Sequence, residues 1–349
     1  METIRDDDAR DASKWTSFAD PDPEYLETIQ AMGGAPNLAA FDNIADLRKF
    51  LARSKAAMSD GYGGIPGVKE EDHQIPMRDG HRITVRVYSP ETKPSGGSPL
   101  GVVLHGGGWC LGGLVGEELL CRLMASKLGM VAVNVDYRLA PEYKFPTGPQ
   151  DCYDATKWAG SAAENASALG ADPSKGFTVG GSSAGGNMGV VVSHLARDEG
   201  LKPALTGCHL MIPAVCSDEC FPEKHKKDWK SWDQLPDAAI LNHKATDLFR
   251  DNYIPNKADR ANHLFSPLFW PSGHKGLPPN YFQIAGGDPL RDEALIYERI
   301  LREDDGVKTK VDLYPGQPHG FWSVFPHMKA SKTFMDDSIN GIKWLLEQQ

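Results

Sequence analysis

The feature that most constrains the fold is a turn of small residues, GGSSAGG, at residues 180–186. It follows an apolar run at 177–179 that predicts a buried strand, and it precedes a predicted helix at 187–197. A strand that turns directly into a helix leaves no space for side chains two positions before and after its central residue. Glycines stand at both positions, Gly181 and Gly185, around Ser183. Ser183 is therefore a candidate nucleophile on a strained turn.

Glycine- and serine-rich turns are also common without any function. The interpretation of Ser183 therefore depends on whether the chain supplies a base, an acid that orients it, and hydrogen-bond donors for an oxyanion.

From residue 100 the chain alternates apolar runs of strand length with helical segments. Apolar runs on successive strands imply that both faces of the sheet are covered, as in a parallel sheet wrapped by helices, which predicts the α/β class. A hairpin around the turn at Arg78-Asp79-Gly80 precedes this region. The expected strands are 73–77, 83–88, 102–104, 131–135, 177–179, 210–215, 281–285 and 311–314, and the expected helices are 117–128, 151–169, 184–197, 293–302 and 328–347.

Two further segments predict a helical cap. Residues 1–60 show apolar residues at helical spacing, and residues 216–255 form a polar insertion with several aromatic residues and a predicted helix at 242–252. The alternative is that both are packing or surface segments without a role. We predict four segments: an N-terminal cap segment (1–70), the first part of the catalytic core (71–215), the cap insertion (216–260) and the second part of the core (261–349).

Composition excludes several classes of partner. The 349 residues carry a net charge of −10, which argues against nucleic acid and against an anionic membrane surface. No apolar stretch reaches the length of a bilayer, and the acidic first residues do not resemble a secretory signal. The six cysteines lack the spacing of a zinc site or a disulfide framework. We therefore expect a cytoplasmic protein with free thiols and no metal.

A second glycine-rich stretch, HGGGW at residues 105–109, directly follows the predicted strand 102–104. Gly106, Gly107 and Gly108 allow the backbone to present N–H groups to a developing negative charge, and the N–H of Ala184 completes such a site. The features of a phosphate-binding loop, a Lys-Ser/Thr pair or a G-x-G-x-x-G motif, are missing. His105 is expected to anchor this loop. We expect the neighbouring Trp109 and Ser182 to contact the substrate.

The candidate base and acid follow the last two predicted strands. His319 lies in the loop after strand 311–314, and Asp288 follows strand 281–285 through two glycines. Functional groups of open α/β sheets gather at the carboxyl ends of strands, so both are expected near Ser183. Asp292 and Glu293, on the next helix, are the rival acids. The chain order Ser183, Asp288, His319 is the one expected of a hydrolase sheet.

These motifs together resemble the hormone-sensitive-lipase branch of the α/β-hydrolases, and fungal members most of all. The matching stretches are HGGGW (105–109), DYRLAPE (136–142), GSSAGG (181–186), DPLRDE (288–293) and HGF (319–321). The resemblance implies the α/β-hydrolase fold with a mostly parallel eight-stranded sheet and a helical cap. It also implies carboxylesterase activity without a cofactor, an architectural role for residues 136–142, and oxyanion donors at Gly107, Gly108 and Ala184. Many members have Asp where this chain has Ser182.

The predicted function is hydrolysis of short-to-medium acyl esters of a small molecule through an acyl-enzyme on Ser183. The same three residues also suit a lactonase, an amidase or an acyltransferase that acts on a specialised substrate. A hormone receptor or a lyase on this fold is disfavoured, because the former typically replaces the histidine and the latter the serine, and both are present here. The family resemblance also makes a homodimer through the edge strand near 311–314 an expectation.

Overall fold

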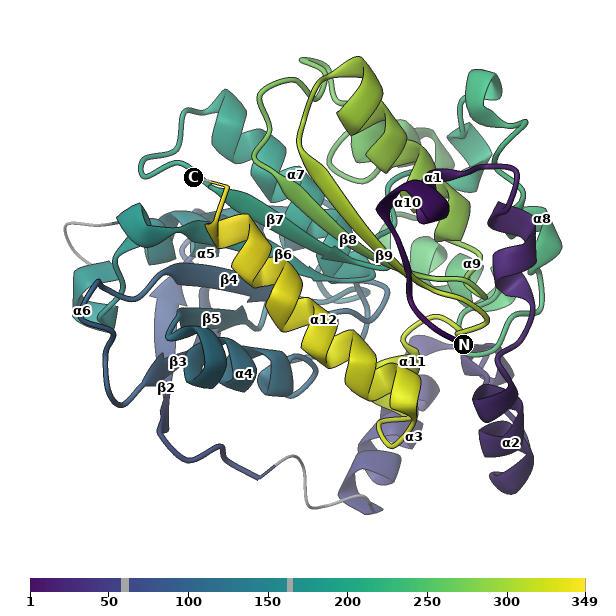
Figure 1. Cartoon of the computed structure of the whole chain (residues 1–349), viewed down its shortest axis with the longest axis horizontal. Helices are drawn as coiled ribbons and strands as arrows, with labels where there is room; N and C mark the ends of the chain where they lie inside the picture. Colours follow the sequence, from purple (N-terminus) through teal and green to yellow (C-terminus); the bar gives the residue numbers. More distant parts are fainter. Residues whose placement is uncertain (58–62, 162–165, 349) are drawn as a thin grey trace.

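The computed structural model describes residues 1–57, 63–161 and 166–348. Within these ranges the core is one twisted sheet of nine strands in the order β1-β9-β8-β7-β6-β4-β5-β3-β2 (Figure 1). The strands are β1 (Ile4–Arg5), β2 (Val68–Pro76), β3 (Arg82–Pro90), β4 (Leu100–Leu104), β5 (Val131–Val135), β6 (Phe177–Ser182), β7 (Gly207–Met211), β8 (Asn280–Ala285) and β9 (Thr309–Tyr314).

The strands from β4 to β9 run parallel to one another, while β1, β2 and β3 pair antiparallel with their neighbours. Every residue of β4, β5, β6, β7 and β8 is buried, which confirms the predicted α/β sheet covered on both faces. The sheet has one strand more than the expected eight. The extra strand, β1, has only two residues, which is too short for a periodic sequence signal.

Strand β1 also changes the edge of the sheet. Ile4 pairs with Leu313 and Arg5 with Asp312, so β9 is not the outermost strand. Residues that follow β1 continue this cover: the Asp6 carboxylate accepts a hydrogen bond from the Val311 N–H. The edge expected to form a homodimer is therefore occupied by the N-terminal segment of the same chain.

Five long helices pack on the sheet. Helices α4 and α12 lie together on one face, in front of the sheet in Figure 1, and α5 and α7 lie together on the other. Helix α4 ends where predicted, because Gly129 adopts a left-handed φ of 63° as its C-cap. The helices are α4 (Glu118–Leu128), α5 (Thr147–Gly160), α7 (Ala184–Asp198), α10 (Arg291–Arg299) and α12 (Lys329–Leu346).

Two predicted helices differ in extent. The helix expected at 151–169 is α5 together with the short α6 (Ser167–Leu169), and residues 162–165 lie outside the described part of the chain. Helix α10 begins two residues earlier than expected and continues as a wider π-helical turn at Ile300–Asp304.

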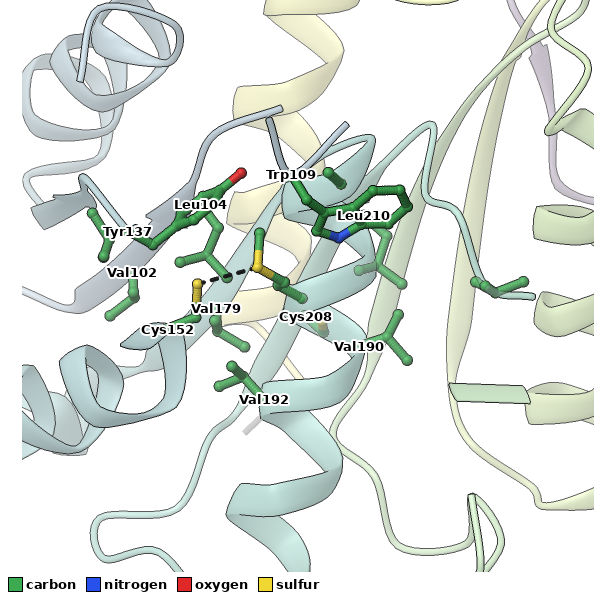
Figure 2. Packing of buried hydrophobic residues seen from close by; sticks show 14 of the residues in the cluster. Val102, Leu104, Trp109, Tyr137, Cys152, Val179, Val190, Val192, Cys208 and Leu210 are labelled. Atoms are coloured by element: carbon green, nitrogen blue, oxygen red, sulfur yellow. Dashed lines mark hydrogen bonds between the residues drawn. The ribbon is translucent and has the colours of Figure 1, made fainter. Parts of the chain in front are cut away.

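The core is formed where these layers meet. Figure 2 shows Val102 and Leu104 of β4, Val179 of β6 and Leu210 of β7 beside residues of helix α7 such as Val190. All are essentially inaccessible to solvent. The carboxyl ends of β4, β6, β8 and β9, where the candidate residues were predicted, are thus anchored in one rigid core.

The two predicted cap segments contact each other. Asn37 forms a β-bridge with Ile240, and the Ile240 N–H donates to Pro36 O at 2.9 Å. The N-terminal segment contains α1 (Asp6–Arg10), α2 (Pro23–Ala31), α3 (Ile44–Ala57) and two 3-10 turns. The insertion contains α8 (Ser231–Gln234), α9 (His243–Tyr253), 3-10 turns at Asp218–Cys220 and Glu223–His225, and a third at its end, Lys257–Ala261. Helix α9 confirms the helix expected at 242–252, whereas the helical stretch expected over residues 1–60 is divided into several pieces. Residues 58–60 lie outside the described ranges. No helix in the described part of the chain is long and apolar enough to cross a membrane.

Candidate active site

The turn between β6 and α7, residues 180–186, is called here the nucleophile turn. Ser183 has φ 54° and ψ −115°, a conformation rare for a residue with a side chain. A Cβ on Gly181 would lie 1.9 Å from the Leu104 carbonyl oxygen, and a Cβ on Gly185 would lie 2.0 Å from the same atom. The prediction that both positions exclude side chains is confirmed. The Ser183 N–H donates to Met211 O at 2.8 Å, which holds the turn against β7.

The structure brings Ser183, His319 and Asp288 together. His319 Nε2 lies 2.9 Å from Ser183 Oγ, and His319 Nδ1 lies 2.7 Å from Asp288 Oδ2. Asp288 is 1% exposed, and its second oxygen accepts the Leu290 N–H at 2.9 Å. An imidazole between a hydroxyl and a buried carboxylate can accept the hydroxyl proton on Nε2 while Nδ1–H donates to the carboxylate.

The two rival acids are bonded elsewhere. Asp292 accepts the backbone N–H groups of Lys230 and Ser231 and pairs with its neighbour Arg291. Glu293 Oε1 accepts the Val215 N–H at 2.7 Å, and burial raises the pKa of this carboxyl to about 8. Asp292 fixes the insertion to the core and Glu293 fixes the loop after β7, which leaves Asp288 as the acid that contacts His319.

Residues 105–109 form what is called here the donor loop. Gly107 and Gly108 have φ values of 125° and 57°, which favour glycine. A Cβ on Gly108 would lie 2.4 Å from the Phe249 ring. None of the hydrogen bonds found among the described residues is donated by the N–H of Gly107 or Gly108. Ala184 is the first residue of α7, so its N–H has no intrahelical partner either. These groups are free to receive an anion.

His105 anchors the donor loop, as expected. Its ring is fully buried, burial lowers its pKa to about 4, and Nδ1 lies 2.8 Å from Gly106 O. The ring stacks on Tyr137, whose hydroxyl donates to His105 O at 2.8 Å. An imidazole that is neutral and enclosed in this way supports the loop and is not available as a second base.

Residues 136–142 brace the donor loop, in agreement with the architectural role that the family resemblance implied. The Ala140 N–H donates to Trp109 O at 2.9 Å. Arg48, from helix α3 of the N-terminal segment, reaches across and donates to Ala140 O at 2.6 Å and to Cys110 O at 2.9 Å. The donor loop is thereby connected to a predicted cap helix.

The two residues expected to contact substrate occupy different surroundings. Trp109 is buried, and its ring stacks parallel to Tyr253 with 5.1 Å between ring centroids. The Ser182 hydroxyl donates to the Glu117 carboxyl below the donor loop. Sequence reasoning did not find Glu117, because an acidic residue at the start of a helix is ordinary and carries no signal of a distant partner.

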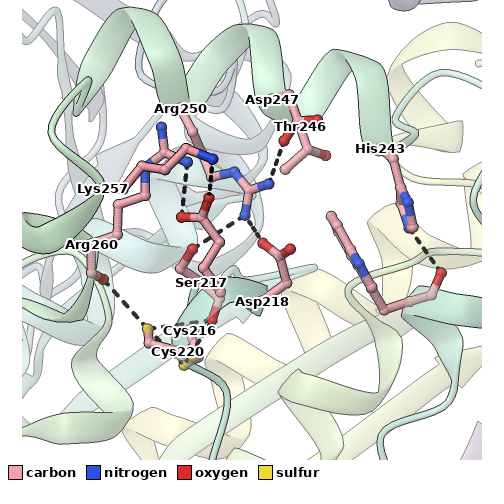
Figure 3. A network of polar contacts seen from close by, with 12 residues as sticks. Cys216, Ser217, Asp218, Cys220, His243, Thr246, Asp247, Arg250, Lys257 and Arg260 are labelled. Atoms are coloured by element: carbon pink, nitrogen blue, oxygen red, sulfur yellow. Dashed lines mark hydrogen bonds and ion pairs between the residues drawn. The ribbon is translucent and has the colours of Figure 1, made fainter.

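A small cavity of about 30 Å³ separates Trp109 from the insertion. Its lining includes Leu290, Trp232 and Arg250, so it lies between the core loops and helix α9. Figure 3 shows Arg250 at the centre of a polar network, with Nη1 3.2 Å from Ser217 Oγ and Nη2 2.6 Å from Asp247 Oδ1. Burial lowers the pKa of Arg250 to about 10, so it remains a cation at neutral pH.

The loop that carries His319 is held by the N-terminal segment. The Gly316 N–H donates to Phe18 O at 2.8 Å, and a Cβ on Gly316 would lie 2.4 Å from Asp20 O. On its other side, the Gly287 N–H donates to Gln317 O at 2.8 Å. Residues 18–20 and the loop after β8 therefore enclose the base loop from two directions.

Comparison with known proteins agrees with this geometry. A family model described as the α/β hydrolase fold matches residues 101–323. An AB hydrolase superfamily protein of Schizosaccharomyces pombe is 38% identical over 94% of this chain and 95% of its own length. Versiconal hemiacetal acetate esterase of Dothistroma septosporum is 36% identical over 80% of this chain and 82% of its own. The crystal structure of vibralactone cyclase has a TM-score of 0.83 and 34% identity, covering 95% of this chain and 96% of that one.

Proposed function

Because the chain belongs to the α/β hydrolase fold family, we propose that it is a serine carboxylic-ester hydrolase that works through an acyl-enzyme on Ser183. One observation carries the proposal: His319 lies within hydrogen-bond distance of both Ser183 Oγ (2.9 Å) and the buried Asp288 carboxylate (2.7 Å). The esterase among the relatives supports the choice of an ester as substrate.

In the proposed first step, Ser183 Oγ attacks the ester carbonyl carbon while His319 Nε2 takes its proton. The N–H groups of Gly107, Gly108 and Ala184 stabilise the oxyanion, and Asp288 stabilises the charged imidazole. His319 then gives the proton to the departing alcohol. Water enters, loses a proton to His319 and releases the acid from Ser183.

We assign the substrate pocket to the space between the core and a cap made of residues 1–70 and 216–260. The cavity beside Trp109 lies between the core loops and helix α9, so we place the acyl group of the ester on this side of Trp109. Trp109 forms its wall, and Ser182 contributes through Glu117 instead of touching the substrate directly. The proposed core consists of residues 71–215 and 261–349.

A second candidate uses the same acyl-enzyme but a different acceptor. In this candidate a hydroxyl of the substrate, in place of water, attacks the acyl group, and the similarity to a cyclase supports it. Analysis of products separates the two candidates, because hydrolysis in H₂¹⁸O places the label in the released acid and internal acyl transfer does not.

We also propose that the partner of this protein is a small-molecule ester and that the protein is cytoplasmic. A homodimer through β9 is not part of it, because β1 and Asp6 engage the outer side of that strand. Sedimentation velocity tests this point, and a wild-type dimer that persists or becomes tighter when residues 1–6 are deleted would contradict it.

The central experiment measures hydrolysis of p-nitrophenyl esters of increasing acyl length by the wild type, by Ser183→Ala, and by Ser95→Ala as a matched control in an exposed loop. We expect activity that declines for long chains, a loss on the order of 10⁴-fold or more in S183A, and no change in S95A. Equal activity in S183A and the wild type would refute the assignment of the nucleophile.

A further inference from the structure

One buried carboxyl, that of Glu117, touches both halves of the proposed oxyanion site. The residue is 6% exposed and directly precedes helix α4. Its Oε1 accepts a hydrogen bond from the Ser182 hydroxyl at 2.5 Å, and hydrogen bonding from the Gly106 backbone opposes the rise of the Glu117 pKa. Ser182 directly precedes the nucleophile, and Gly106 directly precedes the two glycine donors. The mechanism above does not use Glu117.

The donor loop and the nucleophile turn meet at this point. A Cβ on Gly106 would lie 2.7 Å from Ser182 Oγ and 3.5 Å from the Ser183 Cβ. The two segments are therefore closely packed, and a small displacement of one against the other changes the distance between the Gly107 and Gly108 N–H groups and the reacting carbonyl. Glu117 bridges the two backbones with one side chain.

The charge on Glu117 determines how well it can bridge them. An ionised carboxylate only accepts hydrogen bonds, which suits one O–H and one N–H donor. In a protonated carboxyl one oxygen carries an O–H group, which acts as a donor and needs an acceptor of its own, so one acceptor position is lost. Burial raises the pKa of Glu117 to about 7, against the opposing effect of the hydrogen bonds from Ser182 and Gly106. Both forms are therefore populated near neutral pH.

The charged and titratable groups around Glu117 come from α4, β2 and the loops after β4 and β5. They are Glu118, Cys121 and Arg122, then Glu70, His105 and Tyr137. Arg122 pairs with Glu70 at 2.6 Å and with Glu118 at 3.4 Å. Burial raises the pKa values of Cys121 and Tyr137 and lowers that of His105, so these three are uncharged at neutral pH. The charge of Glu117, whose pKa is about 7, changes around neutral pH beside these groups.

We propose that Glu117 is a positioning residue for the oxyanion site, and that its ionised form holds the donor loop against the nucleophile turn through Ser182 and Gly106. The inference rests on the proposed function, since it assigns a role to the same donors. An oxyanion develops only in the transition state, so misplaced donors lower kcat more than they change KM.

A fluorophosphonate probe tests the proposal without knowledge of the natural ester. Ser183 Oγ forms a bond to phosphorus, the P–F bond breaks, fluoride leaves, and His319 takes the hydroxyl proton. The second-order rate constant of labelling is measured by mass spectrometry from pH 5.5 to 9. The variants are Glu117→Gln, which cannot ionise, Ser182→Ala, and Glu118→Gln as a matched control one residue further along the same segment.

We expect the wild type and E117Q to be labelled at similar rates at pH 5.5, and the wild type to be faster on the order of 10-fold at pH 9. The labelling rate of the wild type should therefore rise with pH around an inflection set by Glu117. In S182A this inflection moves to higher pH, because the lost hydrogen bond stabilised the ionised carboxylate. E118Q keeps the inflection of the wild type.

A purely structural role for Glu117 lowers labelling by the same factor at every pH, and that result would overturn the proposal. An unshifted inflection in S182A would also overturn it, and this measurement stands even where E117Q does not fold. If the wild type is not labelled at any pH, the proposed nucleophile is refuted, and this inference with it. That outcome differs from one in which the wild type is labelled but the ratio of its labelling rate to that of E117Q is the same at every pH.

Discussion

Replacing Gly185 by alanine has two opposite effects on the free energy of unfolding: a gain in helix propensity and a loss from steric overlap. Gly185 is the second residue of helix α7, where alanine gains at most about 1 kcal/mol over glycine. The new Cβ, however, would lie 2.0 Å from the Leu104 carbonyl oxygen and 2.6 Å from that of His105. Real Cβ contacts stay beyond about 3.0 Å, so the backbones must separate by about 1 Å. Overpacking of this kind costs about 1–3 kcal/mol or more, so we expect a net loss of stability of about 2 kcal/mol.

The loss of activity should exceed the loss of stability. With an unfolding entropy of about 2.1 cal/mol/K per residue, a loss of about 2 kcal/mol lowers the Tm of a chain of this size by only about 3 °C. Leu104 leads directly into the donor loop, so the same 1 Å shift separates the oxyanion donors from Ser183. A displacement of this size costs on the order of 100-fold in kcat/KM.

The assay compares Gly185→Ala with Gly96→Ala, whose added Cβ meets nothing within 4 Å. Thermal unfolding gives Tm, and hydrolysis of p-nitrophenyl butyrate gives kcat/KM. A G185A variant with the same Tm as G96A and a kcat/KM within twofold of it would show that the added Cβ does not move the two backbones apart.

Three further predictions follow from the same geometry. Asp288→Asn should fold normally but lose on the order of 10³–10⁴-fold in kcat, because the amide favours the wrong tautomer of His319; circular dichroism and kinetics check this. The folded-state pKa of Glu293, about 8, lies above its ordinary value of 4.5, so the wild type loses stability as pH rises from about 4.5 to 8. Urea unfolding should therefore show Glu293→Gln gaining a few kcal/mol relative to the wild type between pH 5 and pH 9, and an equal difference at both pH values would contradict this. Arg48→Met removes the contacts of α3 with the loops beyond the donor loop and should raise KM for p-nitrophenyl esters more than it lowers kcat; an unchanged KM would argue against a cap role for α3.

Much of the site could be predicted because parallel topology places the ends of distant strands together. Ser183, Asp288 and His319 each follow a buried apolar run, and the carboxyl ends of such strands share one edge of the sheet. The glycines at 181 and 185 were predictable for a local steric reason that the sequence displays directly.

Contacts between segments far apart in the chain could not be predicted. Strand β1 has two residues, and its partners in β9 lie about 300 positions away, so no period or motif reveals the pairing. Glu117 looks like a normal first residue of a helix, and only the folded chain places it on Ser182. Arg48 likewise looks like a solvated helix position until α3 is seen to pack on the loops beyond the donor loop.

The contact of residues 18–20 with the loop that carries His319 has a consequence for engineering this enzyme. The family model begins at residue 101, so a designer who exchanges parts between relatives would treat the first hundred residues as an interchangeable specificity module. Yet Phe18 O binds the backbone three residues before His319. A chimera with a foreign N-terminal segment would therefore alter the placement of His319, the proposed general base, together with the proposed substrate pocket. An exchange of the N-terminal segment therefore affects substrate selectivity and turnover together. The segment should be exchanged along with the base loop of the same relative.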